Sequence, residues 1–158
     1  MPFTQEAKQA LFNEVATAIF NQQRICKSGA TCVYDDGRGN HCAIGHLLRA
    51  RGVSLEGLDT GSLGGNSIGV SSAISAFRNK EAGGADDVFS LSTWHLLDGL
   101  KKIGADCEED LQFLQGLQTA HDNSESMSGF ADSMRGMAKR YELDAAVRLN
   151  SLIADSQR

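Results

Sequence analysis

The residues best suited to chemistry lie close together in the segment CKSGATCVYDDGRGNHCAIGH, which spans positions 26–46 and contains three cysteines and two histidines. Cys32 and Cys42 flank DDGRGN, whose Asp, Asn and Gly residues are typical of a tight turn. A hairpin at this turn would bring the two sulfur atoms together. Cys42 and His46 have the i, i+4 spacing that places two side chains on the same face of a helix.

Two thiolates from a turn and an imidazole from a helix form a ligand set typical of structural zinc. Zinc binding lowers the pKa of a cysteine thiol and releases its proton. The sequence therefore predicts zinc as the one candidate cofactor, and the candidate ligands are Cys32, Cys42, His46 and His121, with Cys26 or His41 as other choices for the fourth position. The segment lacks C-x-x-C, so a second interpretation ranks above zinc, in which Cys32 and Cys42 are small buried hydrophobic residues.

A third interpretation makes Cys42 a nucleophile. A cysteine at the start of a helix has its thiol pKa lowered by the macrodipole and by free N–H groups. A cysteine-dependent hydrolase or transferase also needs an imidazole base, and His121 or His46 could provide it. Asp122 follows His121 directly, so on a helix we expect its side chain to point about 100° away from that ring.

The dipeptide His121-Asp122 also suggests a metal-dependent phosphohydrolase of the HD type, with His95 upstream and Asp132 or Asp144 downstream. Such enzymes hold divalent metals with His and Asp side chains, and the metals activate water. A structural interpretation ranks higher: His121 lies half-buried on the apolar face of a helix, and Asp122 helps to turn the chain.

The elements that must position these residues are mainly helical. Apolar residues at helical spacing, with capping residues at the ends, predict a compact bundle of about five to six helices. The predicted helices cover residues 4–24, 41–52, 70–80, 91–103, 106–121 and 126–141. Thr4 is the expected N-cap of the first helix, and Asp106 with Glu109 forms a capping signal. The β-prone run after position 30 predicts one short β-hairpin-like excursion near 31–42.

A length of 158 residues corresponds to one domain, so we expect a single helical domain over 1–158. Within it, the Gly- and Ser-rich stretch 57–69 is expected to be a flexible loop. This stretch lacks the G-x-x-x-x-G-K-[ST] pattern of a phosphate-binding loop.

Charge and composition exclude several classes of protein. Fifteen basic and twenty acidic residues give a net charge of -5, and the basic residues form no stripe, so no duplex nucleic acid is expected as a partner. No run approaches the roughly 18 apolar residues of a membrane span. The N-terminal residues lack the apolar region of a signal peptide, which favours a cytoplasmic protein with reduced cysteines.

Two blocks of the sequence resemble a group of small uncharacterised proteins of bacteriophages and bacteria. The first block consists of Cys32, Tyr34, Gly39, Cys42, Ala43, Gly45, Leu47 and Leu48. The second has the pattern F-L-x-x-L-Q-x-x-H-D and consists of Phe113, Leu114, Leu117, Gln118, His121 and Asp122. The resemblance implies a phage or mobile-element setting and one spatial site that contains the Cys block and His121. It implies no activity.

We therefore predict a small phage or prophage accessory protein that acts by binding a host or defence protein, with a structural Cys/His cluster. The small size, the acidic composition and the lack of a recognised catalytic motif favour this function. The alternative is a cysteine-dependent hydrolase or transferase with Cys42 as nucleophile and His121 or His46 as base. An HD-type metal phosphohydrolase ranks third.

Overall fold

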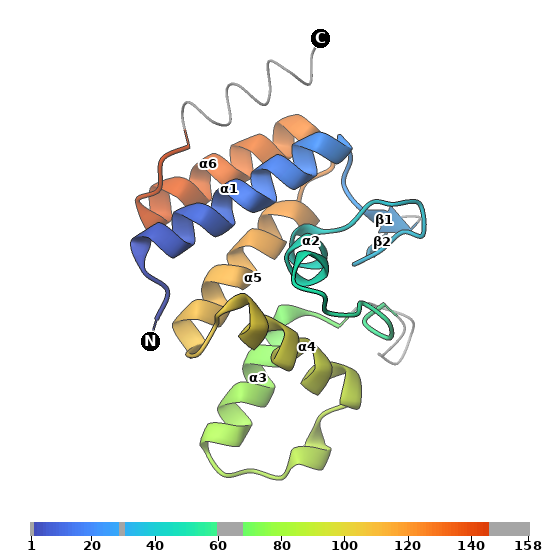
Figure 1. The fold of residues 1–158 in the computed structure, drawn as a ribbon, viewed down its shortest axis with the longest axis vertical. Helices are drawn as coiled ribbons and strands as arrows, with labels where there is room; N and C mark the ends of the chain where they lie inside the picture. The colour runs from blue at the N-terminus through green and yellow to red at the C-terminus, as the bar shows by residue number, and fades with distance from the viewer. Residues whose placement is uncertain (1, 29–30, 60–67, 146–158) are drawn as a thin grey trace.

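The computed structural model describes residues 2–28, 31–59 and 68–145, with the side chains of residues 28, 31 and 32 left out. This part of the chain is mainly helical, as the sequence predicts (Figure 1). Its helices are α1 (Gln5–Gln22), α2 (Ala43–Ala50), α3 (Val70–Glu81), α4 (Leu91–Ile103), α5 (Glu108–Asp122) and α6 (Met127–Tyr141), with a 3-10 helix, η1 (Asp86–Val88), before α4.

Side-chain caps explain where several helices begin. Thr4 accepts a hydrogen bond from the Ala7 N–H at 3.0 Å, which confirms the predicted N-cap of α1. The Asp106–Glu109 capping signal was wrong, because α5 begins after Cys107, whose side chain makes no capping bond. Instead the buried Asp110 carboxylate accepts hydrogen bonds from the N–H groups of Phe3 and Asp106, at 2.7 and 3.2 Å.

The β-hairpin expected near 31–42 is wrong. Two-residue strands do pair earlier, where β1 (Lys27–Ser28) runs antiparallel to β2 (Thr31–Cys32). The segment after β2 is a loop closed by one isolated bridge. Carboxylates replace a strand partner there: Asp36 accepts from two turn N–H groups at 2.7 and 3.1 Å, and Asp59 from two others at 2.8 and 3.2 Å. These side chains, Asp36 from within the turn and Asp59 from farther along the chain, satisfy backbone donors that a strand partner would otherwise bind.

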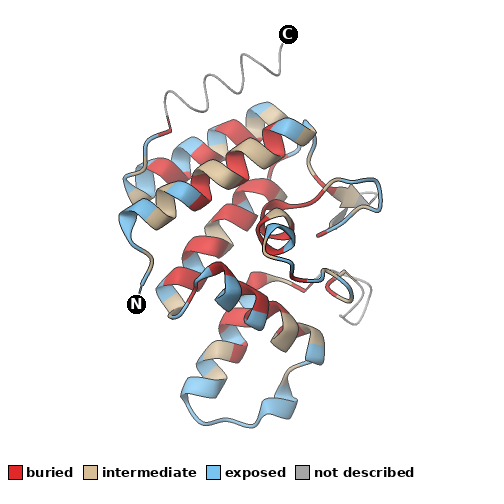
Figure 2. Cartoon of the chain, viewed as in Figure 1, coloured by how far each residue is buried: buried red, intermediate tan, exposed pale blue. Residues whose placement is uncertain are grey.

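Helix α5 lies at the centre of the fold, with α1 and α6 on one side and α3 and α4 on the other (Figures 1 and 2). Its inward residues Phe113, Leu114 and Leu117 are fully buried. Phe20 of α1 packs against Phe130 of α6 with ring centroids 5.6 Å apart. Burial of each such large apolar side chain contributes about 1.5–3 kcal/mol to stability.

The start of α1 is fixed to the end of α6 and the residues that follow it. The Gln5 side-chain amide donates to the main-chain carbonyls of Tyr141 and Glu142, at 2.8 and 3.0 Å. The Gln9 amide donates to the Asp144 carbonyl at 2.9 Å. Segments at opposite ends of the described chain therefore lie side by side.

The predicted loop 57–69 lies largely outside the described residues. Its two ends meet, because the Ile68 N–H donates to the Leu58 carbonyl at 2.8 Å. Among the helices described, none combines the length and the apolar character that a membrane crossing requires.

Candidate functional site

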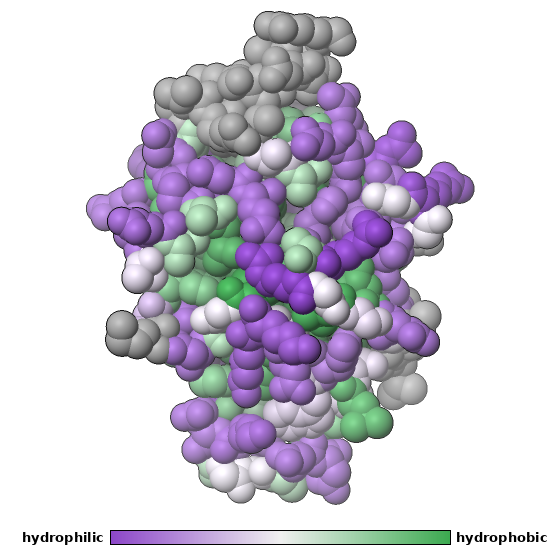
Figure 3. Space-filling view, viewed as in Figure 1, coloured by the Kyte–Doolittle hydropathy of each residue, from purple (hydrophilic) through white to green (hydrophobic). Residues whose placement is uncertain are grey.

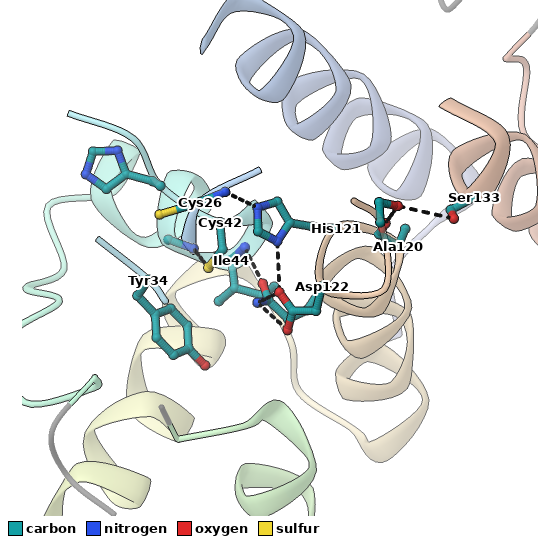
Figure 4. A network of polar contacts seen from close by, with 12 residues as sticks. Cys26, Tyr34, Cys42, Ile44, Ala120, His121, Asp122 and Ser133 are labelled. Carbon is teal, nitrogen blue, oxygen red and sulfur yellow. Dashed lines mark hydrogen bonds and ion pairs between the residues drawn. The ribbon is translucent and has the colours of Figure 1, made fainter. Parts of the chain in front are cut away.

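His121 lies in the last turn of α5, and its side chain is completely buried (Figure 4). Its Nε2 accepts a hydrogen bond from the backbone N–H of Cys26 at 3.0 Å. Because Nε2 is an acceptor, the proton of the neutral ring is on Nδ1, which lies 2.8 Å from Oδ1 of Asp122 and donates to it. The expectation that Asp122 points away from this ring is wrong.

Gln118, one turn earlier on α5, extends the same network. Its amide nitrogen donates to both carboxylate oxygens of Asp122, at 2.9 and 3.0 Å. Its amide oxygen accepts from the Ile44 N–H at 3.0 Å. This N–H is in the first turn of α2, where backbone donors have no partner within the helix. One face of α5 thus holds both the chain before β1 and the start of α2.

Cys42 is the N-cap of α2, and its Sγ accepts from the Gly45 N–H at 3.3 Å. The thiol is fully buried, and this burial raises its pKa well above the ordinary value. Gly45 is needed at its position because a Cβ there would lie 2.6 Å from the Tyr34 carbonyl oxygen. Cys42 thus lies in a tightly packed helix start, where burial favours the protonated form of its thiol.

Cys26 contributes its backbone rather than its sulfur to the histidine. Its thiol donates to the Asn40 carbonyl at 3.2 Å. Burial, and then the negative charge of Asp36, raise the pKa of this thiol to about 12. Figure 4 shows the sulfurs of Cys26 and Cys42 on the same side of the His121 ring, and no dashed contact joins either of them to it.

His46 is directed toward α1. Its Nε2 lies 2.7 Å from Oε1 of Gln22, which also accepts from the His41 N–H at 3.0 Å. The His41 and His46 rings pack edge to face at 5.2 Å. Burial, and then the neighbouring His41, lower the pKa of His46 to about 4. His46 is thus neutral at physiological pH and serves as a donor to α1.

The structure brings Cys26, Cys42 and His121 into one buried region, but among the described residues the candidate ligands Cys42, His46 and His121 do not form a group whose ligand atoms all lie within 4.8 Å of one another. The Nε2 atoms of His46 and His121 are both engaged, with Gln22 and with the Cys26 backbone. In the described part of the chain, one group of three potential ligand atoms lies within 4.8 Å of one another, and it is formed by Asp106, Cys107 and Asp110. The Cys32 side chain lies outside the described residues, so its role as a zinc ligand stays a prediction.

The residues considered for a phosphohydrolase make their described contacts with groups other than His121. His95 is on α4, and its Nε2 lies 2.7 Å from the Ser54 carbonyl oxygen. Asp132 pairs with Arg135 at 2.9 Å on α6. The Asp144 N–H donates to Gln9 of α1. These contacts hold different parts of the fold together and do not extend the His121 network.

A second feature, which sequence reasoning missed, is the connection between α3 and α4. We call residues 81–91 the α3–α4 tip. It lies at the end of the molecule farthest from α1 and α6, and nearly all of it is exposed (Figures 1 and 2). The tip carries the exposed large hydrophobic residues of the described chain, Val88 at 67% and Leu91 at 88% relative exposure. Figure 3 shows hydrophobic surface over the start of α4, next to hydrophilic surface.

Several contacts fix the backbone of the α3–α4 tip. The Trp94 indole donates to the Asp86 carbonyl at 2.9 Å and packs edge-on against Phe89 at 6.0 Å. The Asn79 amide donates to the Ala85 carbonyl at 3.0 Å, and Ser90 caps α4. Phe89 and Trp94 occupy the positions of a hydrophobic staple around this cap. That sequence signal could have revealed where α4 begins, and the structure leaves Leu91, the first residue of the helix, exposed.

The chain has no match among protein-family models, curated proteins or solved structures. Two features of the fold bear on its function: the buried network around His121 and the α3–α4 tip.

Proposed function

We propose that this protein acts by binding another protein through the α3–α4 tip, and that the Cys/His network belongs to its scaffold. The observation that carries the proposal is the 88% exposure of Leu91, on a helix that buries Leu96, Leu97 and Leu100. Val88 adds a second exposed apolar side chain nearby. Single apolar residues are common on protein surfaces, whereas contiguous apolar patches with a polar rim mark interaction sites, and we interpret Val88 and Leu91 as the apolar part of such a patch.

The fixed backbone of the tip favours binding. A loop that is ordered only on association loses conformational entropy, which lowers affinity. Here Asn79 and Trp94 already hold the carbonyl groups of Ala85 and Asp86. Val88 and Leu91 are thus held in one arrangement. Burying them against a partner stabilises the complex, and no entropy is lost in ordering the loop.

The network around His121 supports a scaffold role. Every polar atom described for it has a partner: Cys26 N–H with His121, His121 with Asp122, Asp122 with Gln118, and Gln118 with Ile44 N–H. Satisfied buried networks of this kind fix one packing arrangement. The resemblance of the Cys32 and His121 blocks to phage proteins supports a host or defence protein as the partner.

One observation favours the alternative of a cysteine-dependent hydrolase or transferase. The Asp122–His121 pair has the arrangement of a base and the group that orients it. Cys42 could serve as the nucleophile only if the chain before β1 moved, because the Cys26 N–H occupies His121 Nε2.

The proposal is tested by photo-crosslinking followed by reconstitution. A photo-reactive phenylalanine derivative is placed at Leu91 and, as a matched control, at the exposed Gln112 of α5. We expect one discrete crosslinked protein from position 91 and none from position 112. That protein, purified, should bind the wild-type chain with a defined stoichiometry in calorimetry.

The opposite result would be a purified candidate that does not bind, or crosslinking that does not differ between the two positions. Hydrolysis of activated esters that is lost in Cys42→Ser would favour the enzyme instead.

A further inference from the structure

We infer that the α3–α4 tip recognises a partner surface in which an apolar pocket is rimmed by basic side chains. This inference rests on the proposed function and deepens it by stating the chemistry of the partner. It follows from the distribution of charge around Val88 and Leu91.

The acidic side chains of the tip point into solvent. Glu81, Asp86 and Asp87 are all exposed. Among the ion pairs of the described residues, none includes these three carboxylates. Asp86 and Asp87 directly precede Val88 in η1, so negative charge lies beside the exposed apolar side chain.

The nearby cations of α3 are engaged within the molecule. Arg78 forms an ion pair with Glu108 at the start of α5. The Lys80 ammonium lies over the Trp94 ring, 5.6 Å from its centroid. The charge of Arg78 is thus offset by Glu108, whereas Lys80 keeps its charge beside Trp94. The three carboxylates outnumber this one cation, so the tip stays acidic and these carboxylates are available to a partner.

This pattern distinguishes between classes of partner. Basic side chains around a pocket would be attracted to the three carboxylates, while Val88 and Leu91 enter the pocket itself. Membranes with anionic lipids and duplex nucleic acids carry negative charge, and the same carboxylates would repel them. A basic and apolar protein surface is thus the partner that fits both features.

A random peptide library displayed on phage tests the inference without the natural partner. The probes are the peptides that the immobilised wild-type protein enriches. We expect them to combine Lys or Arg with Leu, Ile or Phe. Trp94 is the single tryptophan of the chain and lies in contact with the tip, so its fluorescence should change as each synthetic peptide binds.

Two kinds of variant separate the apolar and the charged contributions. Leu91→Ser is expected to raise the dissociation rate about tenfold, because hot-spot contacts act mainly on that rate. Asp86→Asn combined with Asp87→Asn is expected to lower the association rate at low salt by about threefold to tenfold and to flatten its salt dependence. The matched control, Glu6→Gln with Glu125→Gln, removes the same charge from exposed positions elsewhere and should leave both rates within about twofold.

Several results would overturn the inference: no enriched peptide, enriched peptides without basic residues, or equal effects of the two charge-neutralised pairs. Binding of the wild type to phosphatidylserine vesicles that is lost in Leu91→Ser would point to a membrane instead. If the partner found by crosslinking loses affinity with Leu91→Ser but not with the Asp86/Asp87 pair, the inference fails and the proposed function stands. If crosslinking identifies no partner at all, the proposed function fails as well.

Discussion

Oδ1 of Asp122 lies 2.8 Å from Nδ1 of His121, although the two residues are immediate neighbours on α5. The contact fixes the ring so that Nε2 meets the backbone of Cys26. In hydrolases, a carboxylate placed in this way orients a histidine base. In this protein the same contact holds the chain before β1 in place. The function of the pair can therefore be tested through stability as well as through activity.

His121→Ala should be strongly destabilising. The substitution leaves the Cys26 N–H without its described partner, removes one partner of Asp122 and opens a cavity in a fully buried position. We expect the free energy of unfolding to fall by about 3–4 kcal/mol. Urea denaturation followed by circular dichroism measures this loss. His95→Ala, which removes one hydrogen bond to Ser54, serves as the control and should cost about 1 kcal/mol. Equal losses would contradict the role assigned to the network.

Gly45→Ala should also destabilise the fold. The added Cβ would lie 2.6 Å from the main-chain oxygen of Tyr34, so the start of α2 must shift. We expect a loss of about 2–3 kcal/mol. Gly136→Ala is the matched control on α6, where an added Cβ meets nothing within 4 Å. That substitution should stabilise the protein by about 0.5–1 kcal/mol, since alanine favours helix over glycine. Thermal unfolding of both variants tests the contrast, and a shift of the same sign in both would refute it.

The thiols should differ in their rates of alkylation. Cys26 and Cys42 are buried and have raised thiol pKa values, whereas Cys107 is only half-buried. With iodoacetamide near pH 8, we expect the first two to react about 100-fold or more slowly than Cys107, because the thiolate is the reacting form. Peptide mapping by mass spectrometry resolves the sites. Rapid modification of Cys42 in the folded protein would instead support the enzyme.

Stability should decrease in mild acid because of His46. Its pKa is lowered from 6.5 to about 4 in the folded chain, so below pH 6.5 the unfolded chain binds the proton more readily. The stabilising contribution is therefore complete above pH 6.5 and is lost as the pH falls toward 4. His46→Gln keeps a donor for Gln22 and does not titrate. Urea denaturation across this range should show a smaller decrease for the variant, and identical curves would rule out His46 as the cause.

The helices were predictable because local signals and periodicity agreed. For α4, Ser90 supplies the cap and Gly104, with φ 118°, ends the helix at the predicted residue. For α5 the signals competed: Asp106 and Glu109 matched a capping pattern, but Asp110 was buried and took the N–H of Asp106. The Phe3 N–H also donates to Asp110, and these two residues are far apart in the sequence. The spacing of residues along the chain carries no information on such a contact, so the start of α5 was mispredicted.

The sequence predicted which residues lie in the candidate site but not which atoms contact one another. Sequence blocks suggested that the cysteine segment and His121 meet, and the structure places His121 against Cys26. The partner atom was a backbone N–H rather than a sulfur, which no spacing pattern reports. The turn after β2 was expected to close a hairpin, but the carboxylates of Asp36 and Asp59 satisfied its donors.

The hydrogen bonds from Gln5 and Gln9 to carbonyls after residue 140 have a consequence for protein synthesis. Helix α1 is translated before α6, and Phe20 and these glutamines find their partners only when α6 and the residues behind it have been made. Part of the apolar face of α1 therefore stays uncovered until α6 has been made, and nascent chains with such exposed surface are prone to aggregate. Chaperones that bind nascent chains would hold α1 during this interval, and their release would coincide with the synthesis of α6.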